Sequence, residues 1–514
     1  MSAAYGNWGS GYVTDVPYVP GYYRQQSPLH LRLTCLLGGV AVPPLKPDGP
    51  LSYLELGCGQ GLGAALLAAA NPGWRVTAID FSPAHIAAAR ELAAEAGIGN
   101  ITYLEADLTT LAGSPAAAAI AEVDVASLHG LWSWVGDPVR AGTARLLGDK
   151  VKPGGIVYVS YNALPGWQSA LGMQRLLLEA GHRVLAPSDR QAAAGFELVR
   201  ELTKAKAHHL LATQEMQSMI ENRRVQASYL AHEYMNADWR PCFHADVVAA
   251  LGAAKFEWVG PAHLLEYFQQ LMLSEEARAI VARYDEPIMR ELVKDMFLSR
   301  SLRQDVFVRG ARRLGAAERN AALGEVMLAL LCAPEQFVWD LDVPEGRAGM
   351  ARDFYGPIVA ALQRGPQRVR DLLVLPDLPR RDNPVELVGM LVGSGQALPV
   401  SGPAREPEST VRALNRAAAR RFVGRDNLNA AIALASSGTG APVPCQGVDL
   451  AVADRLQSGE AFDAKAIARG LAPDAPDSEH DRVAALIDRR AAEGAPIWRR
   501  LGVLGAADAA PSDA

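Results

Sequence analysis

The sequence predicts a doubly wound, Rossmann-like α/β sheet that carries a helical insertion and is followed by mostly α-helical C-terminal modules. Short apolar runs alternate with Ala-rich helical stretches over residues 51–162, and a glycine-rich turn follows the first run. Helical periodicity dominates most of the remaining chain. The five expected strands are LSYLEL, WRVTAID, ITYLEAD, EVDVASL and GGIVYVSY. Strands separated by helices in this way form a parallel sheet.

The chain of 514 residues is longer than one hydrophobic core supports, so we expect several structural units. FHADVVAALGAAKFEWVG indicates a helix and a strand that return the chain to the sheet after a long helical stretch. The predicted units are an N-terminal lid segment (1–50), a sheet domain (51–166 plus 226–265), a helical insertion (167–225), a helical middle domain (266–349), a winged-helix-like module (350–402) and a C-terminal helical region with a disordered tail (403–514).

Composition narrows the classes of function. The net charge of -6 gives no basic field for phosphates, so we expect no nucleic-acid partner. Five scattered cysteines without a CxxC or Cys/His cluster indicate a reducing compartment and no metal. No signal peptide precedes the fold, and no apolar stretch reaches the roughly 18 residues of a membrane helix. We therefore expect a cytoplasmic protein without a membrane partner.

The glycine-rich turn is the strongest motif. Gly57, Gly59 and Gly61 follow the first strand directly, where they allow positive φ angles and close approach of a ligand to the backbone. A dinucleotide site requires GxGxxG, but Leu62 occupies the third glycine position. The GxGxG spacing favours S-adenosylmethionine (SAM), which has no pyrophosphate. A purely structural βα turn is the alternative.

Acidic residues at or near the ends of the first three strands support a nucleoside ligand. Asp80 ends the second strand and can hold both ribose hydroxyls. Asp107 ends the third strand, where it would border the adenine or merely cap a helix. Glu55 precedes the loop and could orient the methionine ammonium. The predicted cofactor site comprises Glu55, Gly57, Cys58, Gly59, Gly61, Asp80, Phe81, Ala106, Asp107 and His129.

Several segments resemble class I SAM-dependent methyltransferases that carry a methyltransferase regulatory domain. These segments are YVTDVPYVPGYYRQQSPLHL, LELGCGQG, HGLWSWVGDP, SYNALPGW and, more loosely, YLAHEYMNADWRP. The characterised members of this family include bacterial protein-lysine methyltransferases that act on an outer-membrane protein. The resemblance implies SAM binding, a helical insertion that forms a homodimer, and a protein or peptide substrate, such as a surface or outer-membrane protein before export.

The substrate is expected at the carboxyl ends of the fourth and fifth strands, because ligands of open α/β sheets bind there. Tyr18, Asp15, Tyr161 and Asn162 are predicted to position a lysine amine, with His129 as proton acceptor. Trp132 would wall an aromatic channel that lowers the pKa of the amine by desolvation. It stands where relatives carry Tyr, so its position offers no hydroxyl. Core packing of Trp132 and a structural role for His129 are the alternatives.

Three other functions remain open. A small-molecule or natural-product methyltransferase would use the same fold. A catalytically silent SAM-binding regulator would keep the intact glycine loop. A nicotinamide oxidoreductase is opposed by Leu62 and by the lack of a second nucleotide-binding half.

Overall fold

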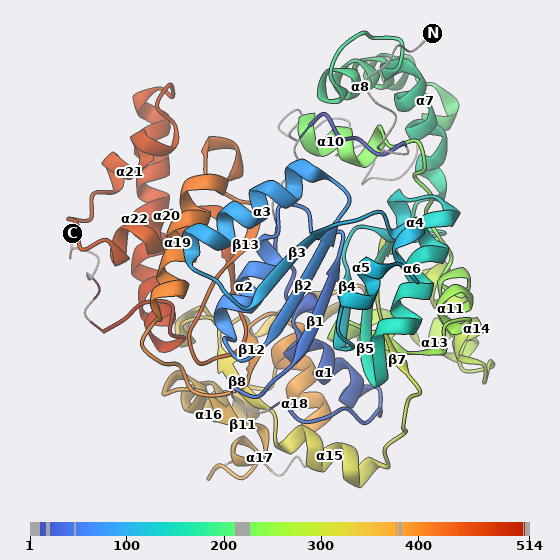
Figure 1. Ribbon diagram of the computed structural model, residues 1–514. Helices are drawn as coiled ribbons and strands as arrows, with labels where there is room; N and C mark the ends of the chain where they lie inside the picture. The colour runs from blue at the N-terminus through green and yellow to red at the C-terminus, as the bar shows by residue number, and fades with distance from the viewer. Residues whose placement is uncertain are drawn as a thin grey trace.

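The computed structural model describes residues 11–16, 21–45, 48–210, 227–376, 378–379, 383–506 and 508. A seven-stranded sheet of order β3-β2-β1-β4-β5-β7-β6 lies at its centre (Figure 1). The five strands predicted from sequence are confirmed as β1 to β5, and only β7 runs antiparallel to its neighbours β5 and β6. The strands are β1 (Ser52–Leu56), β2 (Arg75–Asp80), β3 (Ile101–Glu105), β4 (Val123–Leu128), β5 (Val151–Asn162), β6 (Phe256–Pro261) and β7 (Leu302–Arg309).

Strand β7 corrects the predicted domain boundaries. It lies within residues 266–349, which we expected to be helical, and it fills the position between β5 and β6. The sheet domain therefore extends to Arg309 rather than ending at residue 265. The periodicity of β7 is hidden because Arg303 and Asp305 are buried, whereas Leu302 is exposed. The expected helices around it are present as α13 (Glu275–Val281), α14 (Pro287–Phe297) and α15 (Ala316–Gly324).

Helices cover both faces of the sheet, as a doubly wound fold requires. Tyr53 and Val125 point into one core, while their neighbours Leu54 and Ala126 point into the other. The first core contains α2 (Leu62–Ala70), α3 (Pro83–Ala96) and part of α1 (Pro28–Leu37). The second contains α4 (Leu108–Leu111), α5 (Pro115–Ala119), α6 (Asp137–Lys150) and α11 (His244–Gly252).

The insertion is a separate helical unit above the carboxyl ends of the strands (Figure 1). It contains α7 (Leu171–Gly181), α8 (Ser188–Lys204) and α10 (Ala227–Tyr234), which share one apolar cluster with Val13. Because α10 packs on α7 and α8, the insertion extends beyond its predicted end at residue 225, and the second part of the sheet domain begins later than residue 226. Dimerisation through this unit stays a prediction.

The C-terminal modules follow the sequence prediction in outline. The expected three helices and strand of residues 350–402 are α16 (Arg352–Gln363), α17 (Val369–Leu372), α18 (Pro384–Gly393) and β12 (Ala397–Val400). Strand β12 pairs with β8 (Met327–Leu330), which also pairs with β11 (Gln367–Arg368), so this module begins before residue 350. Between β8 and α16 lie β9 (Asp340–Val343) and β10 (Gly346–Gly349), which pair antiparallel.

The last region packs against the sheet domain. Its elements are α19 (Ser409–Phe422), β13 (Ala431–Leu434), β14 (Val443–Gln446), α20 (Gly447–Gln457), α21 (Ala464–Leu471) and α22 (Asp477–Arg500). Helix α19 lies against α2 and α3 in one continuous apolar core, and Arg421 forms an ion pair with Glu95 of α3. Most of the predicted disordered tail, residues 505–514, lies outside the described residues, but its described Asp508 forms an ion pair with Arg412 of α19 at 2.8 Å. Across the described ranges, no helix combines the length and apolar character needed to cross a bilayer.

Candidate active site

The glycine loop joins β1 to α2 with three residues in the left-handed region. The φ angles of Gly57, Gly59 and Gly61 are 74°, 52° and 75°, values that glycine adopts without the steric cost of a side chain. The backbone N–H groups of Gly57 and Cys58 donate to the carbonyl oxygen of Ile79 at 2.8 and 3.0 Å. These two bonds fix the loop against the end of β2.

Gly61 is also required by packing. A Cβ atom at this position would lie 2.6 Å from both Ala89 Cβ and Tyr103 Cε1, closer than side chains approach one another. The Tyr103 hydroxyl donates to the Gly61 carbonyl oxygen at 2.9 Å. Gly61, the last glycine of the GxGxG motif, therefore also allows the start of α2 to pack closely against α3 and β3.

A pocket borders this loop. Besides the loop residues, its walls are Gly21, Tyr23, Gln26, Glu55 and His129. The side chains therefore come from β1, from the end of β4 and from the segment before α1. Sequence reasoning missed Tyr23 and Gln26, although both lie in the N-terminal segment that carried the family resemblance.

Glu55 presents an unsatisfied carboxylate oxygen at this pocket. Its Oε1 accepts a hydrogen bond from Gln26 Nε2 at 3.3 Å, whereas the buried Oε2 has no hydrogen-bond partner among the described residues. Burial raises the pKa of Glu55 to about 7, an effect that Gln26 opposes and the charge of Asp80 reinforces. A buried carboxylate is stabilised by a cation, so the site fits the α-ammonium of SAM.

Asp80 lies at the tip of β2, beside the loop. Its Oδ2 accepts a hydrogen bond from the Gly59 backbone at 2.8 Å, and its Oδ1 accepts one from Ser82 at 2.9 Å. His85 Nδ1 lies 3.2 Å from Oδ1. The carboxylate is thereby held in one orientation next to the loop, at the position from which an acid contacts a ribose in doubly wound nucleotide-binding folds.

The remaining predicted cofactor residues, Phe81, Ala106 and Asp107, lie at neighbouring strand ends. Phe81 follows Asp80 and makes an edge-to-face contact with Tyr12, with ring centroids 5.7 Å apart. The Ala106 backbone N–H donates to the Asp80 carbonyl at 3.0 Å. Asp107 is exposed and caps α4, its carboxylate accepting from the Thr109 backbone at 2.8 Å. The helix-cap alternative therefore accounts for the contact that Asp107 makes.

His129 forms a wall of the pocket. Its ring stacks on Tyr23 with centroids 3.7 Å apart, and its Nδ1 lies 2.8 Å from the Tyr158 hydroxyl. Burial lowers the pKa of His129 to about 3, so the imidazole is neutral and only weakly basic near pH 7. This favours a role in shaping the pocket and argues against the predicted role of proton acceptor.

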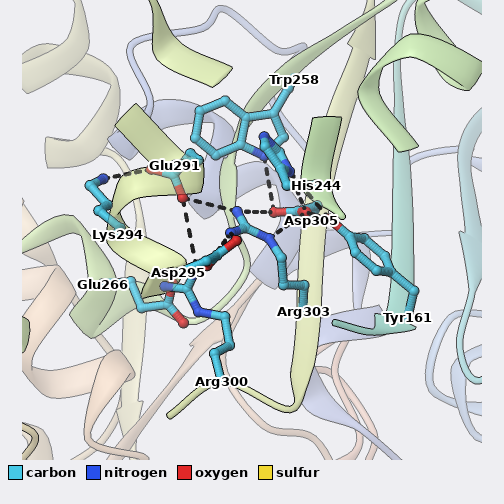
Figure 2. Close-up of polar contacts among 10 residues, drawn as sticks. All are labelled: Tyr161, His244, Trp258, Glu266, Glu291, Lys294, Asp295, Arg300, Arg303 and Asp305. Carbon is cyan, nitrogen blue, oxygen red and sulfur yellow. Dashed lines mark hydrogen bonds and ion pairs between the residues drawn. The ribbon is translucent and has the colours of Figure 1, made fainter. Parts of the chain in front are cut away.

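The Tyr161 side chain, predicted to position the amine, makes its contacts in the protein interior. Its hydroxyl donates to Asp305 Oδ2 at 2.5 Å and lies 3.2 Å from His244 Nδ1, in the interior between β5, β7 and α11 (Figure 2). Tyr161 and Tyr158 point to opposite faces of β5, and it is Tyr158 that reaches His129. The hydroxyl of Tyr161 is therefore engaged away from the glycine-loop pocket.

Tyr161 belongs to a buried charge network centred on Arg303 (Figure 2). The Arg303 guanidinium contacts Asp305 at 3.0 Å, Asp295 at 2.8 Å and Glu291 at 2.9 Å. Trp258 Nε1 donates to Asp305 at 3.0 Å. The remaining members drawn are His244, Glu266, Lys294 and Arg300. The network ties α14, β6 and β5 to β7, and sequence reasoning missed it entirely.

The other predicted substrate residues are placed as follows. Asp15 is exposed and accepts hydrogen bonds from the Ser188 backbone and hydroxyl at 2.8 and 2.7 Å, at the start of α8. Trp132 is buried in the same apolar core as Leu128, as its core-packing alternative states. The Asn162 side-chain nitrogen is buried without a hydrogen-bond partner among the described residues. Tyr18 lies outside the described residues.

The sheet order with its single antiparallel strand, the glycine loop, and the carboxylates of Glu55 and Asp80 together define a class I SAM-dependent methyltransferase. Family models match in two segments: a methyltransferase domain over residues 54–155 and a predicted methyltransferase regulatory domain over residues 226–309. The second segment supplies β6 and β7, so the regulatory region completes the sheet.

Two proteins related in sequence and one solved structure also resemble this chain. The uncharacterized protein sll1526 of Synechocystis is 33% identical over 366 residues, which is 71% of this chain and 71% of that protein. The uncharacterized protein RP789 of Rickettsia prowazekii is 28% identical over 207 residues, 39% of this chain and 36% of its own length. Among solved structures, PKMT2 from Rickettsia typhi in complex with AdoHcy has a TM-score of 0.67 at 15% identity, covering 95% of this chain and all of that one.

The chain belongs to the family of SAM-dependent methyltransferases that carry a methyltransferase regulatory domain. No group of three or more His, Cys, Asp or Glu side chains arranged to hold a metal ion is present within the described residues.

Proposed function

We propose that this enzyme transfers the methyl group of SAM to the side-chain amine of lysine in a protein. The observation that carries the proposal is the extent of the likeness to PKMT2, a rickettsial lysine methyltransferase, which spans 95% of this chain. That span takes in the helical insertion and the C-terminal modules as well as the sheet. A fold shared only through the sheet would serve many acceptors, whereas accessory units shared along the whole chain favour an acceptor of similar kind.

SAM supplies an electrophilic methyl group on a sulfonium, and the protein has to position the amine in line with it and exclude water. Glu55 would hold the α-ammonium and Asp80 the ribose. Gly57 and Gly59 leave space for the ligand beside the backbone. The stacked rings of Tyr23 and His129 would shield the other side of the pocket from solvent.

Labelled SAM tests the proposal. Purified full-length enzyme is incubated with methyl-tritiated SAM and protein extract from the source organism, and labelled protein is hydrolysed and separated by amino-acid analysis. We expect label in methylated lysine, with outer-membrane or surface proteins as the acceptor class. Asp80→Asn, which keeps the shape of the side chain and removes its charge, serves as the control with lowered SAM affinity. Label found only in small molecules would instead support a natural-product methyltransferase, and no label with intact SAM binding would support a silent regulator.

A further inference from the structure

A groove runs along α6 on the flank of the sheet where α6 and α11 lie side by side (Figure 1). The α6 residues that line it, from Asp137 to Asp149, recur with three- and four-residue spacing, so they form one face of the helix. Because each residue of an α-helix rises 1.5 Å, the groove extends about 18 Å along α6. Its volume of about 920 Å³ is at the upper end of the range for small-ligand clefts. A cavity of this length suits a linear ligand.

Small residues form the floor of this α6–α11 groove. They come from both helices and from the turn that follows α11: Ala141, Ala144, Gly148, Ala250, Ala253 and Ala254. A Cβ atom at Gly148 would lie 3.4 Å from Ala254 Cβ, so α6 nearly touches the turn there. Methyl groups offer no hydrogen bonds to a base or a sugar, and their small size leaves room for the backbone of a peptide. The floor therefore favours a polypeptide over a nucleic acid.

The groove carries an excess of positive charge, although the chain as a whole has a net charge of -6. Its cationic lining residues are Arg140, Arg145, Arg240, Lys255 and Arg309. Its carboxylates are Asp137, Asp149 and Asp246. Asp137 forms ion pairs with Arg240 at 3.0 Å and with Arg140 at 3.7 Å. Within the part of the chain that the structure describes, Arg145, Lys255 and Arg309 form no ion pair. Such a local excess of cations attracts a ligand of opposite charge.

One end of the groove lies close to the cofactor pocket. Trp132 lines the groove, and its carbonyl oxygen accepts a hydrogen bond from Arg140 Nε at 2.9 Å. His129, which lines the cofactor pocket, precedes Trp132 by three residues, so their Cα atoms are at most about 11 Å apart. Between them, Leu131 Cδ1 lies 3.4 Å from the place that a Cβ atom of Gly57 would take. A peptide in the groove therefore reaches the carboxyl edge of the sheet beside the glycine loop.

We propose that the α6–α11 groove binds an acidic segment of the acceptor protein, next in sequence to the lysine that is methylated; this inference rests on the proposed lysine methyltransferase activity. The acceptor carboxylates pair with Arg145, Lys255 and Arg309, and its backbone lies on the alanine floor. At about 3.3 Å per residue, about five or six extended residues span the length of the groove.

Fluorescence anisotropy of the full-length enzyme tests this with a dye-labelled peptide in which Glu and Ala alternate on both sides of one Lys. The test variant combines Arg145→Gln with Lys255→Asn, because asparagine suits the left-handed backbone of Lys255, whose φ angle is 68°. The matched control combines Arg364→Gln with Lys206→Asn, two exposed residues outside the groove, and the φ angle of Lys206 is 59°. We expect affinity to fall about fivefold or more in the test variant at low salt, and to stay within about twofold of the parent value in the control.

Ala141→Trp gives a second test that changes no charge. Ala141 is exposed in the groove, so the larger side chain fills the space without disturbing the core, and peptide affinity should again fall. Methyl transfer from tritiated SAM to protein extract should slow about threefold or more in the Arg145→Gln, Lys255→Asn variant, with AdoHcy affinity unchanged by calorimetry.

Parent-like peptide affinity or parent-like labelling in this variant would overturn the inference, as would an equal loss in the control. A single-stranded RNA oligonucleotide that displaces the peptide at a lower concentration would also overturn it, because the groove would then serve a nucleic acid. Absence of labelled lysine with the parent enzyme is a different result, since it rejects the proposed function, whereas the peptide titration still measures the groove.

Discussion

The unpaired carboxylate oxygen of Glu55 predicts that SAM binding depends on pH between 6 and 7. With the pKa of Glu55 at about 7, the free site is mostly protonated at pH 6 and half ionised at pH 7. The ammonium of the ligand requires the carboxylate, so binding releases a proton and affinity rises with pH. The ionised fraction grows from about one tenth to one half, which predicts about a fivefold gain in affinity, or about 1 kcal/mol. The α-amino group of the ligand, with a pKa near 7.7 to 8.0, stays largely protonated over this range.

Calorimetric titration of the full chain with AdoHcy at pH 6.0, 6.5 and 7.0 measures this dependence. Repeating the pH 6.0 titration in two buffers of different ionisation enthalpy counts the protons released, and we expect about one per binding event. Glu55→Gln is the matched control, because it keeps the side-chain shape and leaves His85 beside Asp80 in place. We expect it to bind more weakly and with little pH dependence. A flat profile for the parent protein, or an equal slope in the control, would refute the role given to Glu55.

Three further predictions concern the loop, its supports and the buried network. Gly61→Ala combines a φ angle of 75° with a Cβ contact of 2.6 Å to Tyr103, so thermal and urea denaturation should show a loss of about 2–4 kcal/mol; a change below about 1 kcal/mol would contradict the packing argument. Arg24→Met removes the guanidinium that donates to the Gly393 carbonyl oxygen at 3.3 Å. The segment that carries Tyr23, a residue lining the pocket, then loses this attachment to α18. We expect AdoHcy affinity to fall several-fold with little change in melting temperature, and unchanged affinity would show that α18 does not support the pocket. Arg303→Met leaves buried carboxylates without their cation and should lower the free energy of unfolding by about 3–5 kcal/mol, measured by urea denaturation; parent-like stability would argue against the network as drawn.

The parts of the fold that were predicted from sequence are those with local signals. The strands β1 to β5 each show an apolar run followed by a turn or helix, and the glycine loop follows β1 without interruption. Asp80 could be named because it ends a strand. These features depend on neighbours in the sequence, so their patterns are visible without knowledge of long-range contacts.

The parts that sequence reasoning missed depend on distant contacts. Strand β7 does not alternate in the usual way, because the buried Arg303 and Asp305 are compensated by partners from other elements. Tyr161 was assigned to the substrate since it lies near the carboxyl end of β5, but only the pairing of β7 with β5 brings Asp305 to its hydroxyl. His232 of the short helix α10 contacts the Val16 carbonyl oxygen at 2.9 Å, and no local pattern reveals this contact.

A crystal structure of the full chain with AdoHcy would show where the cofactor binds. We expect the ligand against the turn between β1 and α2, with its amine within hydrogen-bond distance of Glu55 Oε2 and its ribose hydroxyls at the Asp80 carboxylate. AdoHcy bound elsewhere, or bound here with neither carboxylate in contact, would contradict the account.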